Sequence, residues 1–367
     1  MAKFTEVFED VTKQGTKIPT NRYLQDGLYP IIDQGQSEVA GYTNEEQGLF
    51  TNVPAIIFGD HTRIIKYVDT PCFLGADGVK LLKAKEPHAN YKYLYYVLCN
   101  AEIPDTGYNR HFKWLKEANI PEHSAKEQGD IVAQLEMIDN LISLRKQQLS
   151  KLDELVKSRF IELFGDVKTN KFGWEKCHFG DVTTKITDGE HGTVPRVEKG
   201  EGYLYFMARN ITKDGNIDLT ETSYVPEETH RKIYKRCNPE TGDILLVCVG
   251  ATIGKCTIVP KDFEEFCMAR SVALIKPDNQ KVNSTFLISL LKSDAIQNDI
   301  FNCAHAAAQA GLYTNMIINL DAFLPPIELQ NQFATFVEQT DKSKFEIQKS
   351  LETLETLKKA LMQKYFG

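Results

Sequence analysis

Long hydrophobic runs are missing from this sequence. No stretch of about 18 apolar residues occurs in its 367 residues, so we expect no membrane-spanning helix. The residues that follow Met1 are polar almost at once and lack the apolar core of a signal peptide. The sequence therefore predicts a cytoplasmic protein.

Cysteine pairs with metal-binding or redox spacing are also missing. The sequence has eight cysteines, and no two of them are separated by two residues, as zinc ligands or a redox pair would be. Several lie in apolar runs, such as Cys248, which favours small buried side chains in a reducing compartment. We therefore expect neither a zinc site nor a redox pair.

An excess of positive charge is missing as well. The formal net charge is −7, and no large segment of the chain has more basic than acidic side chains. This balance argues against a protein that binds DNA by bulk basic charge. Any nucleic-acid surface has to be a local patch, or a partner has to hold much of the DNA backbone.

Catalytic motifs are absent too. Residues 249–256 resemble a phosphate-binding loop, but three residues separate Gly250 from Gly254 where that loop needs four, and Cys256 replaces the required Ser or Thr. A strand, a tight glycine turn and a second strand are the better interpretation. The sequence also lacks the cofactor loop and Asn-Pro-Pro-aromatic motif of an adenine methyltransferase, a nucleophile elbow and paired metal-binding histidines. We predict no catalytic, cofactor or metal site.

What the sequence does contain is an internal repeat, with units at about residues 1–165 and 166–367. The openings match as Phe8-Glu9-Asp10-Val11-Thr12 and Phe179-Gly180-Asp181-Val182-Thr183. Segment 119–121 before Glu127-Gln128 matches segment 323–326 before Asn331-Gln332. The ends match through Leu149, Leu152, Leu155 and Phe164-Gly165 against Leu351, Leu354, Leu357 and Phe366-Gly367. Matches in the same order indicate a duplication.

Each unit ends in a long predicted helix. Over about 125–163, apolar residues recur at alternating steps of four and three, which is a coiled-coil seam, with Arg145 at one seam position. A second helix runs over about 328–365, where Thr340 and Lys344 interrupt the seam. Helices that are roughly 50–60 Å long need a partner for their apolar stripe. We expect the two to pair within the chain; a homodimeric coiled coil is the alternative.

The remaining sequence is predicted to be β-rich with some helix. Strands are expected at 55–58, 78–82, 243–247 and 271–275, and short helices at 91–99 and 284–291. No regular strand–helix alternation of a doubly wound sheet occurs. The predicted fold is mixed α+β, with globular domains at 1–120 and 167–323 and long spacer helices at 121–166 and 324–367.

These segments together resemble the specificity (S) subunit of type I restriction-modification systems, over essentially the whole chain. The strongest similarity lies in residues 160–166 followed by Gly173-Trp174, in residues 324–333, and in residues 242–255 followed by 269–274. In the more divergent first unit, residues 57–63 and 75–79 look like the same places in a second subtype.

The resemblance implies a DNA-recognition subunit without a catalytic site of its own. Each globular domain is then a target-recognition domain for one half of a bipartite, asymmetric double-stranded DNA sequence, and the two long helices pack antiparallel as a coiled-coil spacer. The implied partners are two methyltransferase subunits and, where present, restriction (motor-nuclease) subunits. S-adenosylmethionine belongs to the methyltransferase subunits, so this chain is expected to hold no cofactor.

Polar loops at matched places of the two units are the candidate DNA contacts, because Arg, Asn, Gln and Thr side chains recognise base edges. In the first unit they are Thr16, Lys17, Gln34, Gln36, His61, Thr62, Arg63, Tyr108, Asn109, Arg110, His111 and Lys113. In the second they are Asp188, His191, Arg209, Asn210, Thr252, Lys255, Arg270, His305, Gln309 and Tyr313. The alternative for each is an ordinary solvated loop, and for Arg270 a structural ion pair.

The sequence leaves two other functions open. One is a non-enzymatic coiled-coil scaffold whose two β-rich modules bind protein or glycan, which the charge balance permits. The other is an enzyme of unfamiliar type, which is disfavoured because no nucleophile, base and cofactor loop come together. The target bases do not follow from the sequence, since recognition loops of this kind obey no residue-to-base code.

Overall fold

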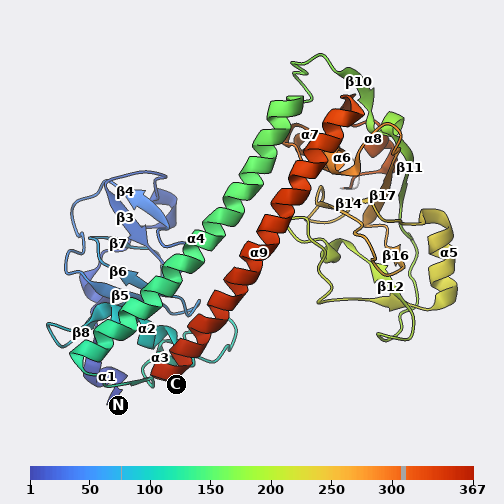
Figure 1. The fold of residues 1–367 in the computed structure, drawn as a ribbon. Helices are drawn as coiled ribbons and strands as arrows, with labels where there is room; N and C mark the ends of the chain where they lie inside the picture. Colours follow the sequence, from blue (N-terminus) through green and yellow to red (C-terminus); the bar gives the residue numbers. More distant parts are fainter. Residues whose placement is uncertain (76, 307–310) are drawn as a thin grey trace. The chain divides into compact units, whose positions relative to one another are not determined.

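A computed structural model describes residues 1–75, 77–306 and 311–367 of the chain (Figure 1). The chain divides into two compact units, unit 1 with Met1–Gln147 and Gln348–Gly367, and unit 2 with Gln148–Ile347. Two 40-residue helices, α4 (Ala125–Phe164) and α9 (Ile327–Phe366), each contribute one part to each unit. Neither these nor any other described helix is apolar enough over a sufficient length to cross a membrane.

Among its described residues, unit 1 contains short strands and three short α-helices besides its parts of α4 and α9. The strands are β1 (Ala2–Lys3), β2 (Phe8–Asp10), β3 (Tyr29–Ile32), β4 (Gly41–Thr43), β5 (Ala55–Gly59), β6 (Ile65–Val68), β7 (Phe73–Leu74), β8 (Val79–Ala84) and β9 (Asn119–Ile120). The helices are α1 (Phe4–Val7), α2 (Tyr91–Cys99) and α3 (Phe112–Leu115). The sheets have the orders β2-β8-β5-β6, β4-β3-β7 and β1-β9.

Unit 2 has the same order of strands. Its strands are β10 (Glu175–His178), β11 (Thr183–Asp188), β12 (Tyr203–Phe206), β13 (Tyr224–Val225), β14 (Ile244–Val247), β15 (Cys256–Ile258), β16 (Phe266–Met268), β17 (Val272–Pro277) and β18 (Asp321–Leu324). Its helices are α5 (Glu227–Cys237), α6 (Ser284–Leu291), α7 (Asp294–Ala306) and α8 (Thr314–Ile318). The sheets have the orders β11-β17-β14-β15, β13-β12-β16 and β10-β18.

Sheet topology confirms the internal repeat. Replacing each strand of unit 1 by its counterpart, β1 by β10 through β9 by β18, converts every sheet of unit 1 into a sheet of unit 2. In both three-stranded sheets the middle strand pairs parallel with one neighbour and antiparallel with the other. The predicted α+β class, the strands within the four expected segments and the helices at 91–99 and 284–291 are all present.

The opening of the repeat begins at Phe4 in unit 1, and the match at Phe8 is wrong. The capping hydrogen bond is the same in both units: Lys3 N–H to the Glu6 carboxylate at 2.7 Å, and His178 N–H to the Asp181 carboxylate at 2.8 Å. The N–H groups of Phe4 and Phe179 then donate to equivalent carbonyls, those of Ala118 and Leu320. The pattern Phe-x-acidic-Val occurs at both Phe4 and Phe8. The segment at Phe8 has more residues identical to the segment at Phe179, so sequence identity alone favours the incorrect match.

The long helices correspond residue for residue, with Ala125 equivalent to Ile327. The Gln128 side-chain amide donates to the carbonyl of His123 at 3.0 Å, and the equivalent Gln330 donates to that of Pro325 at 2.8 Å. The leucine matches at the helix ends agree with this register. The match of Gln128 to Gln332 is therefore wrong, because the residue of α9 that makes the same hydrogen bond as Gln128 is Gln330.

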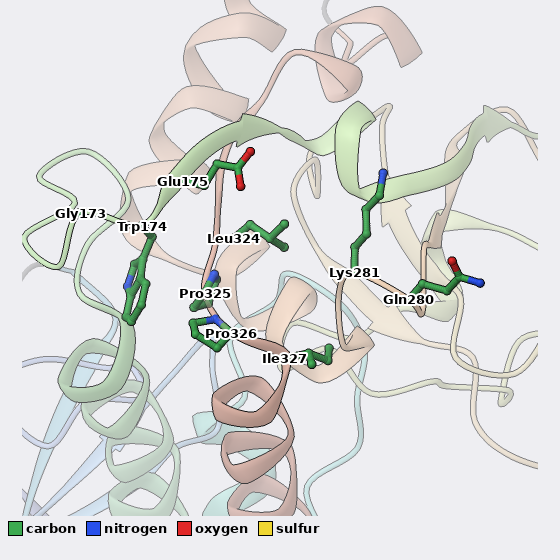
Figure 2. Close-up of a pocket in the computed structure, with 9 residues that line it drawn as sticks. All are labelled: Gly173, Trp174, Glu175, Gln280, Lys281, Leu324, Pro325, Pro326 and Ile327. Atoms are coloured by element: carbon green, nitrogen blue, oxygen red, sulfur yellow. The ribbon is translucent and has the colours of Figure 1, made fainter.

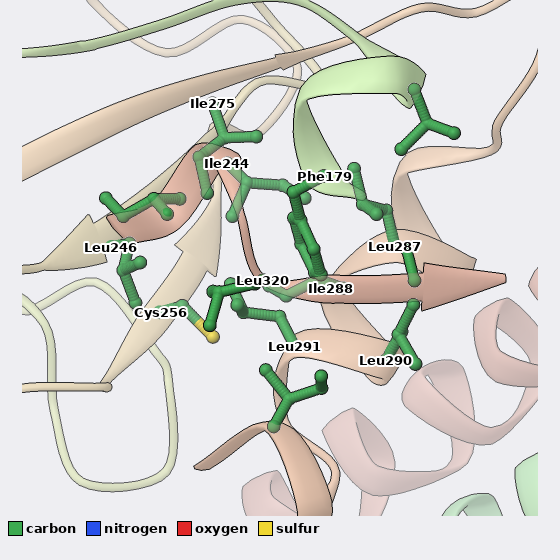
Figure 3. Close-up of a cluster of buried hydrophobic side chains, with 14 of the residues drawn as sticks. Phe179, Ile244, Leu246, Cys256, Ile275, Leu287, Ile288, Leu290, Leu291 and Leu320 are labelled. Carbon is green, nitrogen blue, oxygen red and sulfur yellow. The ribbon is translucent and has the colours of Figure 1, made fainter. Parts of the chain in front are cut away.

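Strand β14 is buried on both faces. Ile244 and Leu246 point into a cluster completed by Phe179 and by side chains of α6 (Figure 3), whereas Leu245 and Val247 belong to the cluster of the three-stranded sheet. Successive side chains of a strand point to opposite faces, so burial of both faces requires a continuous apolar run. In unit 1, β5 is buried in the same way between two clusters.

Within each unit, α4 and α9 pack antiparallel, as the resemblance implied. In unit 1, ion pairs join Asp139 to Lys358 at 2.5 Å and Lys146 to Glu355 at 3.4 Å. In unit 2, Asp153 of α4 pairs with Lys344 of α9 at 2.6 Å. Partner numbers fall along α9 as they rise along α4, and the helices pair within one chain. At the predicted seam interruptions, Lys344 is thus ion-paired and Thr340 is buried, its hydroxyl donating to the Phe336 carbonyl.

Phe333 of α9 provides a stability test of unit 2. Its ring is fully buried, 5.6 Å from the Phe160 ring and 5.5 Å from the Phe164 ring. We expect Phe333→Ala to lower the free energy of unfolding by about 3–5 kcal/mol, because the cavity cannot close fully. Phe345→Ala on the same helix is the control, since Phe345 is 67% exposed, and should change it by about 0.5 kcal/mol or less. Denaturant titration followed by circular dichroism measures both; equal losses would contradict the packing.

Candidate nucleic-acid interface

In unit 1 the sheet topology brings the predicted loops to one edge. The end of β5 lies beside the start of β6 and the start of β8, because β5 runs antiparallel to both. The turn His61–Arg63 follows β5, and Gly78 directly precedes β8. Gln34 follows β3, whose last residue is adjacent to the end of β7. The predicted contacts therefore lie on a single loop surface.

Gln34 joins these loops to one another. Its backbone carbonyl accepts from the Thr62 hydroxyl at 2.6 Å, and its side-chain oxygen accepts from the N–H of His61 at 3.2 Å. Its side-chain NH₂ donates to the carbonyl of Asp77 at 3.0 Å, and Lys17 pairs with the Asp77 carboxylate at 2.9 Å. Gln34 thus connects its own loop to two others, while Thr16 and Gln36 are exposed.

An exposed aromatic pair stands on this surface. Tyr108 is 88% exposed. Its ring stacks on the His61 ring, with centroids 4.6 Å apart and planes 6° from parallel. His61 Nδ1 lies 3.1 Å from the carbonyl of Asn109, and Arg63 donates to Asp105 at 2.8 Å. The backbone N–H of Gly107 and the Arg63 guanidinium hold the pKa of Asp105 below its usual value. A flat face and a guanidinium are therefore presented together.

His111 is placed differently from its neighbours. Its side chain is fully buried, with Nδ1 3.0 Å from the Asp60 carbonyl and Nε2 3.3 Å from the Thr106 hydroxyl. A buried ring with both nitrogens engaged cannot reach a base edge, so we correct its predicted role from DNA contact to support of the loop. Arg110 and Lys113 on either side are exposed.

In unit 2 the equivalent edge gathers the predicted loops in the same way. The end of β14 pairs with the start of β17 and lies near the start of β15, and the end of β11 lies against the start of β17. Asp188, the Thr252–Lys255 turn and Arg270 consequently lie at one edge. Arg270 N–H donates to the Glu190 carbonyl at 3.0 Å, which joins two of these loops.

Backbone contacts bring two further segments to this edge. The N–H of Ala208 donates to the Ser271 hydroxyl at 3.3 Å, which places the turn η4 (Ala208–Asn210) beside Arg270. The N–H of Leu312 donates to the Cys248 carbonyl at 2.8 Å, which places Tyr313, 47% exposed, at the end of β14. Five separate segments thus form the unit 2 surface.

Individual side chains of unit 2 differ in availability. Asn210 is buried and bonded to the carbonyls of Asp218 and Glu221, so its predicted role is likewise corrected to structural support. Arg209 donates to the Ser223 hydroxyl at 2.7 Å, and His191 lies 2.6 Å from the Asp188 carboxylate. Arg270 is exposed and has no ion pair among the described residues, so the structural ion pair considered for it is not present there.

The remaining predicted residues are placed as follows. Thr252 and Lys255 lie half-buried in the turn between β14 and β15, which confirms the strand–turn–strand interpretation. His305 is exposed, with its ring 4.0 Å from that of Phe301. Gln309 lies outside the described residues.

A hollow of about 480 Å³ opens at the start of α9 (Figure 2). It is lined by Gly173, Trp174, Glu175, Gln280, Lys281, Leu324, Pro325, Pro326 and Ile327. None of the predicted DNA contacts lines it. In the described part of the chain, no group of three His, Cys, Asp or Glu side chains is arranged to hold a metal.

The cysteines are mostly small buried side chains, as expected, with Cys99 as an exposed exception. Burial raises the pKa of the Cys248 thiol to about 12 and that of Cys256 to about 11. Both thiols are therefore protonated near neutral pH and unsuited to act as nucleophiles.

These features define a class of protein, a duplicated α+β protein with a loop surface at the same sheet edge of each unit. The chain matches the family described as "Type I restriction modification DNA specificity domain" at residues 1–154 and 173–359. The chain belongs to this family.

Individual relatives are distant. The chain is 27% identical to the putative type I restriction enzyme MjaX specificity subunit of Methanocaldococcus jannaschii, over 53% of this chain and 45% of that protein. It is 25% identical to the MjaVIII specificity subunit of the same organism, over 68% and 61%, and 29% identical to the Escherichia coli EcoBI specificity subunit, over 42% and 32%. The matches span about a third to three fifths of these relatives.

Solved structures share the fold. The S subunit of a type I system from M. genitalium superposes with a TM-score of 0.60 at 18% identity, covering 100% of this chain and 95% of that one. A chain from a study of type I complex assembly and conformational transition superposes with a TM-score of 0.54 at 16% identity, with the same coverage.

The contrast between His111 and Tyr108 is testable. We expect His111→Ala to lower the unfolding free energy of unit 1 by about 2–4 kcal/mol, because it leaves a cavity and removes the ring's hydrogen bonds to the Asp60 carbonyl and the Thr106 hydroxyl. Tyr108→Ala removes an exposed ring and should change stability by about 0.5 kcal/mol or less. Thermal unfolding monitored by calorimetry measures both variants. A destabilised Tyr108→Ala protein would mean that this ring holds the loop and is not available to a ligand.

Proposed function

We propose that this chain recognises a bipartite, asymmetric sequence in double-stranded DNA, one half with each loop surface, and does so as a non-catalytic subunit. The observation that carries the proposal is the duplication of the surface: equivalent strand ends gather polar loops in both units. Membership of the DNA specificity domain family supports it. In this proposal, residues 1–120 and 167–323 are the target-recognition domains, and residues 121–166 and 324–367 are the spacer helices.

The chemistry of the surfaces suits base recognition more than bulk phosphate binding. Arg63 and Arg270 can donate two hydrogen bonds to guanine, whereas the Asn109 side-chain amide donates to Thr106 within its own loop. Tyr108 offers a flat apolar face to a base edge or sugar. The net charge of −7 leaves much of the phosphate contact to partner subunits.

Two methyltransferase subunits are the proposed principal partners, and their docking surface is on the long helices. Leu155 of α4 and Leu357 of α9 are equivalent positions, and they are 48% and 46% exposed, respectively. Paired exposed leucines at repeat-related sites suit two identical partners, since apolar helix faces are common docking surfaces. S-adenosylmethionine and the modification of adenine belong to these partners in this proposal, and restriction subunits join the complex where present.

The first test is a genome-wide map of N6-methyladenine in cells with and without this gene, by single-molecule sequencing. We expect deletion to abolish methylation at one asymmetric motif that has two short specified parts around a fixed unspecified gap. If no site changes although the partner methyltransferase is expressed, the proposal fails and a coiled-coil scaffold that binds proteins becomes the better explanation.

Modularity gives a second test. Replacing residues 1–118 by the corresponding part of a relative with a different target should change one half of the methylated motif and leave the other half and the gap unchanged. The reason is that the proposed unit 2 surface is formed by residues of 167–323 alone. The same methylation map measures the result, and a change in both halves, or in neither, contradicts the assignment.

A further inference from the structure

Helix α5 distinguishes unit 2 from unit 1. It lies in the connection from β13 to β14, whereas the equivalent connection from β4 to β5, residues 44–54, contains no helix. One face of α5 is buried through His230, Ile233 and Cys237 against β12 and β16. The helix is therefore a firmly packed addition to the common fold.

The solvent face of α5 is basic on balance, because its four exposed cations outnumber the exposed Glu227 and Glu228 of its first turn. Its exposed cations are Arg231, Lys232, Lys235 and Arg236. Arg231 is neutralised by an ion pair with Glu227 one turn earlier. Lys232 and Lys235 have no ion pair with any residue that the structure describes, so their charges are available to a ligand.

The last turn of α5 continues the loop surface of unit 2. The Arg236 guanidinium donates to the carbonyl of Gly189, and the Cys237 thiol lies 3.3 Å from the carbonyl of Asp188. The cations also act on the neighbouring loop electrostatically. The N–H of Gly192, together with Arg236 and Lys232, holds the pKa of Glu190 below its usual value. The basic face thus adjoins the loop 188–191 at the candidate interface.

We infer that the basic face of α5 binds the phosphate backbone of the DNA whose bases the unit 2 loops contact, an inference that rests on the function proposed above. Lysine ammonium groups on long flexible stems are suited to phosphates and carry no base information. A protein partner is a poorer fit, because α5 exposes no large apolar side chain that could anchor it.

The inference makes the two units unequal in how they hold DNA. In unit 1 the equivalent connection carries Glu45, which is ion-paired with Arg22, and the exposed Glu46. The exposed Glu46 at that place repels phosphates, whereas the charge of Glu45 is neutralised by Arg22. Unit 2 therefore contributes more of the salt-dependent binding, and unit 1 relies more on its base contacts or on partner subunits.

The test uses the complex with its methyltransferase partners, a duplex that carries the mapped target, and a scrambled duplex of equal length. We compare Lys232→Gln/Lys235→Gln with the wild type between about 0.05 and 0.3 M salt. The plot of log affinity against log salt should become shallower by about 0.9 for each lost phosphate contact, about 1.8 in total. Both duplexes should weaken by the same factor, at least about tenfold near 0.1 M salt.

Two further variants separate the phosphate contact from other effects. Lys199→Gln/Lys261→Gln removes the same charge from the segments that precede β12 and β16. These two strands run parallel and their last residues lie at the interface, so their first residues lie away from it. This charge-matched control should therefore leave the salt slope unchanged. Lys232→Arg/Lys235→Arg keeps the charge and should restore the slope. Thermal unfolding verifies that every variant is folded, because basic residues near a helix C-terminus also stabilise the helix.

The outcomes distinguish this inference from the proposed function. If the wild-type complex does not prefer the target duplex, the proposed function fails. If it does prefer the target but the Gln variant keeps the wild-type salt slope, or loses preference for the target at an unchanged slope, α5 is not a phosphate contact and the inference is overturned. A uniform loss with a shallower slope, absent from the charge-matched control, supports it.

Discussion

The apolar stripes of the two long helices are the constraint on which the rest of the structure depends. A 40-residue helix with such a stripe is not stable alone in water, so each part of α4 needs a partner. In unit 1 that partner is the C-terminal part of α9. Helix α2 also holds α4 there, because the Tyr96 hydroxyl donates to Asp139 of α4 at 2.8 Å. In unit 2, Phe160 and Phe333 bury the same stripe. Duplication supplies both helices in one chain.

The second constraint is the topology of the four-stranded sheets. Strand β5 pairs antiparallel with β6 and β8, and β14 pairs antiparallel with β15 and β17. The loops that follow β5 and β14 therefore lie beside the loops that precede their neighbouring strands, at one edge of each sheet. The connections can then vary in length and composition while the strands stay buried on both faces. This division explains how one fold can present two different binding surfaces, one with a stacked His61–Tyr108 pair and the other beside a basic helix.

Much of the candidate site could be located from the sequence, because polar loops between apolar strands are visible as composition. The sequence could not show which side chains of a loop face the solvent. His111 and Asn210 look like their exposed neighbours, yet their polar atoms are used by backbone groups distant in the sequence, as when His111 Nδ1 lies 3.0 Å from the Asp60 carbonyl. The net charge does not reveal the cations of α5, because the acidic residues of the same segment offset them; only the helical spacing of Ile233 and Cys237 points to a separate solvent face.

The sequence by itself determined the α+β class, the duplication, the bounds of the long helices to within a residue or two and the family, since these depend on periodicity and on order along the chain. Only the tertiary structure decided the register of the two repeats at Phe4 and Gln128, because competing matches differ in hydrogen bonding and not in residue type. It also decided which loops meet at the sheet edge, and which polar side chains remain free to bind. Both depend on contacts between residues far apart in the chain, and local patterns do not encode these.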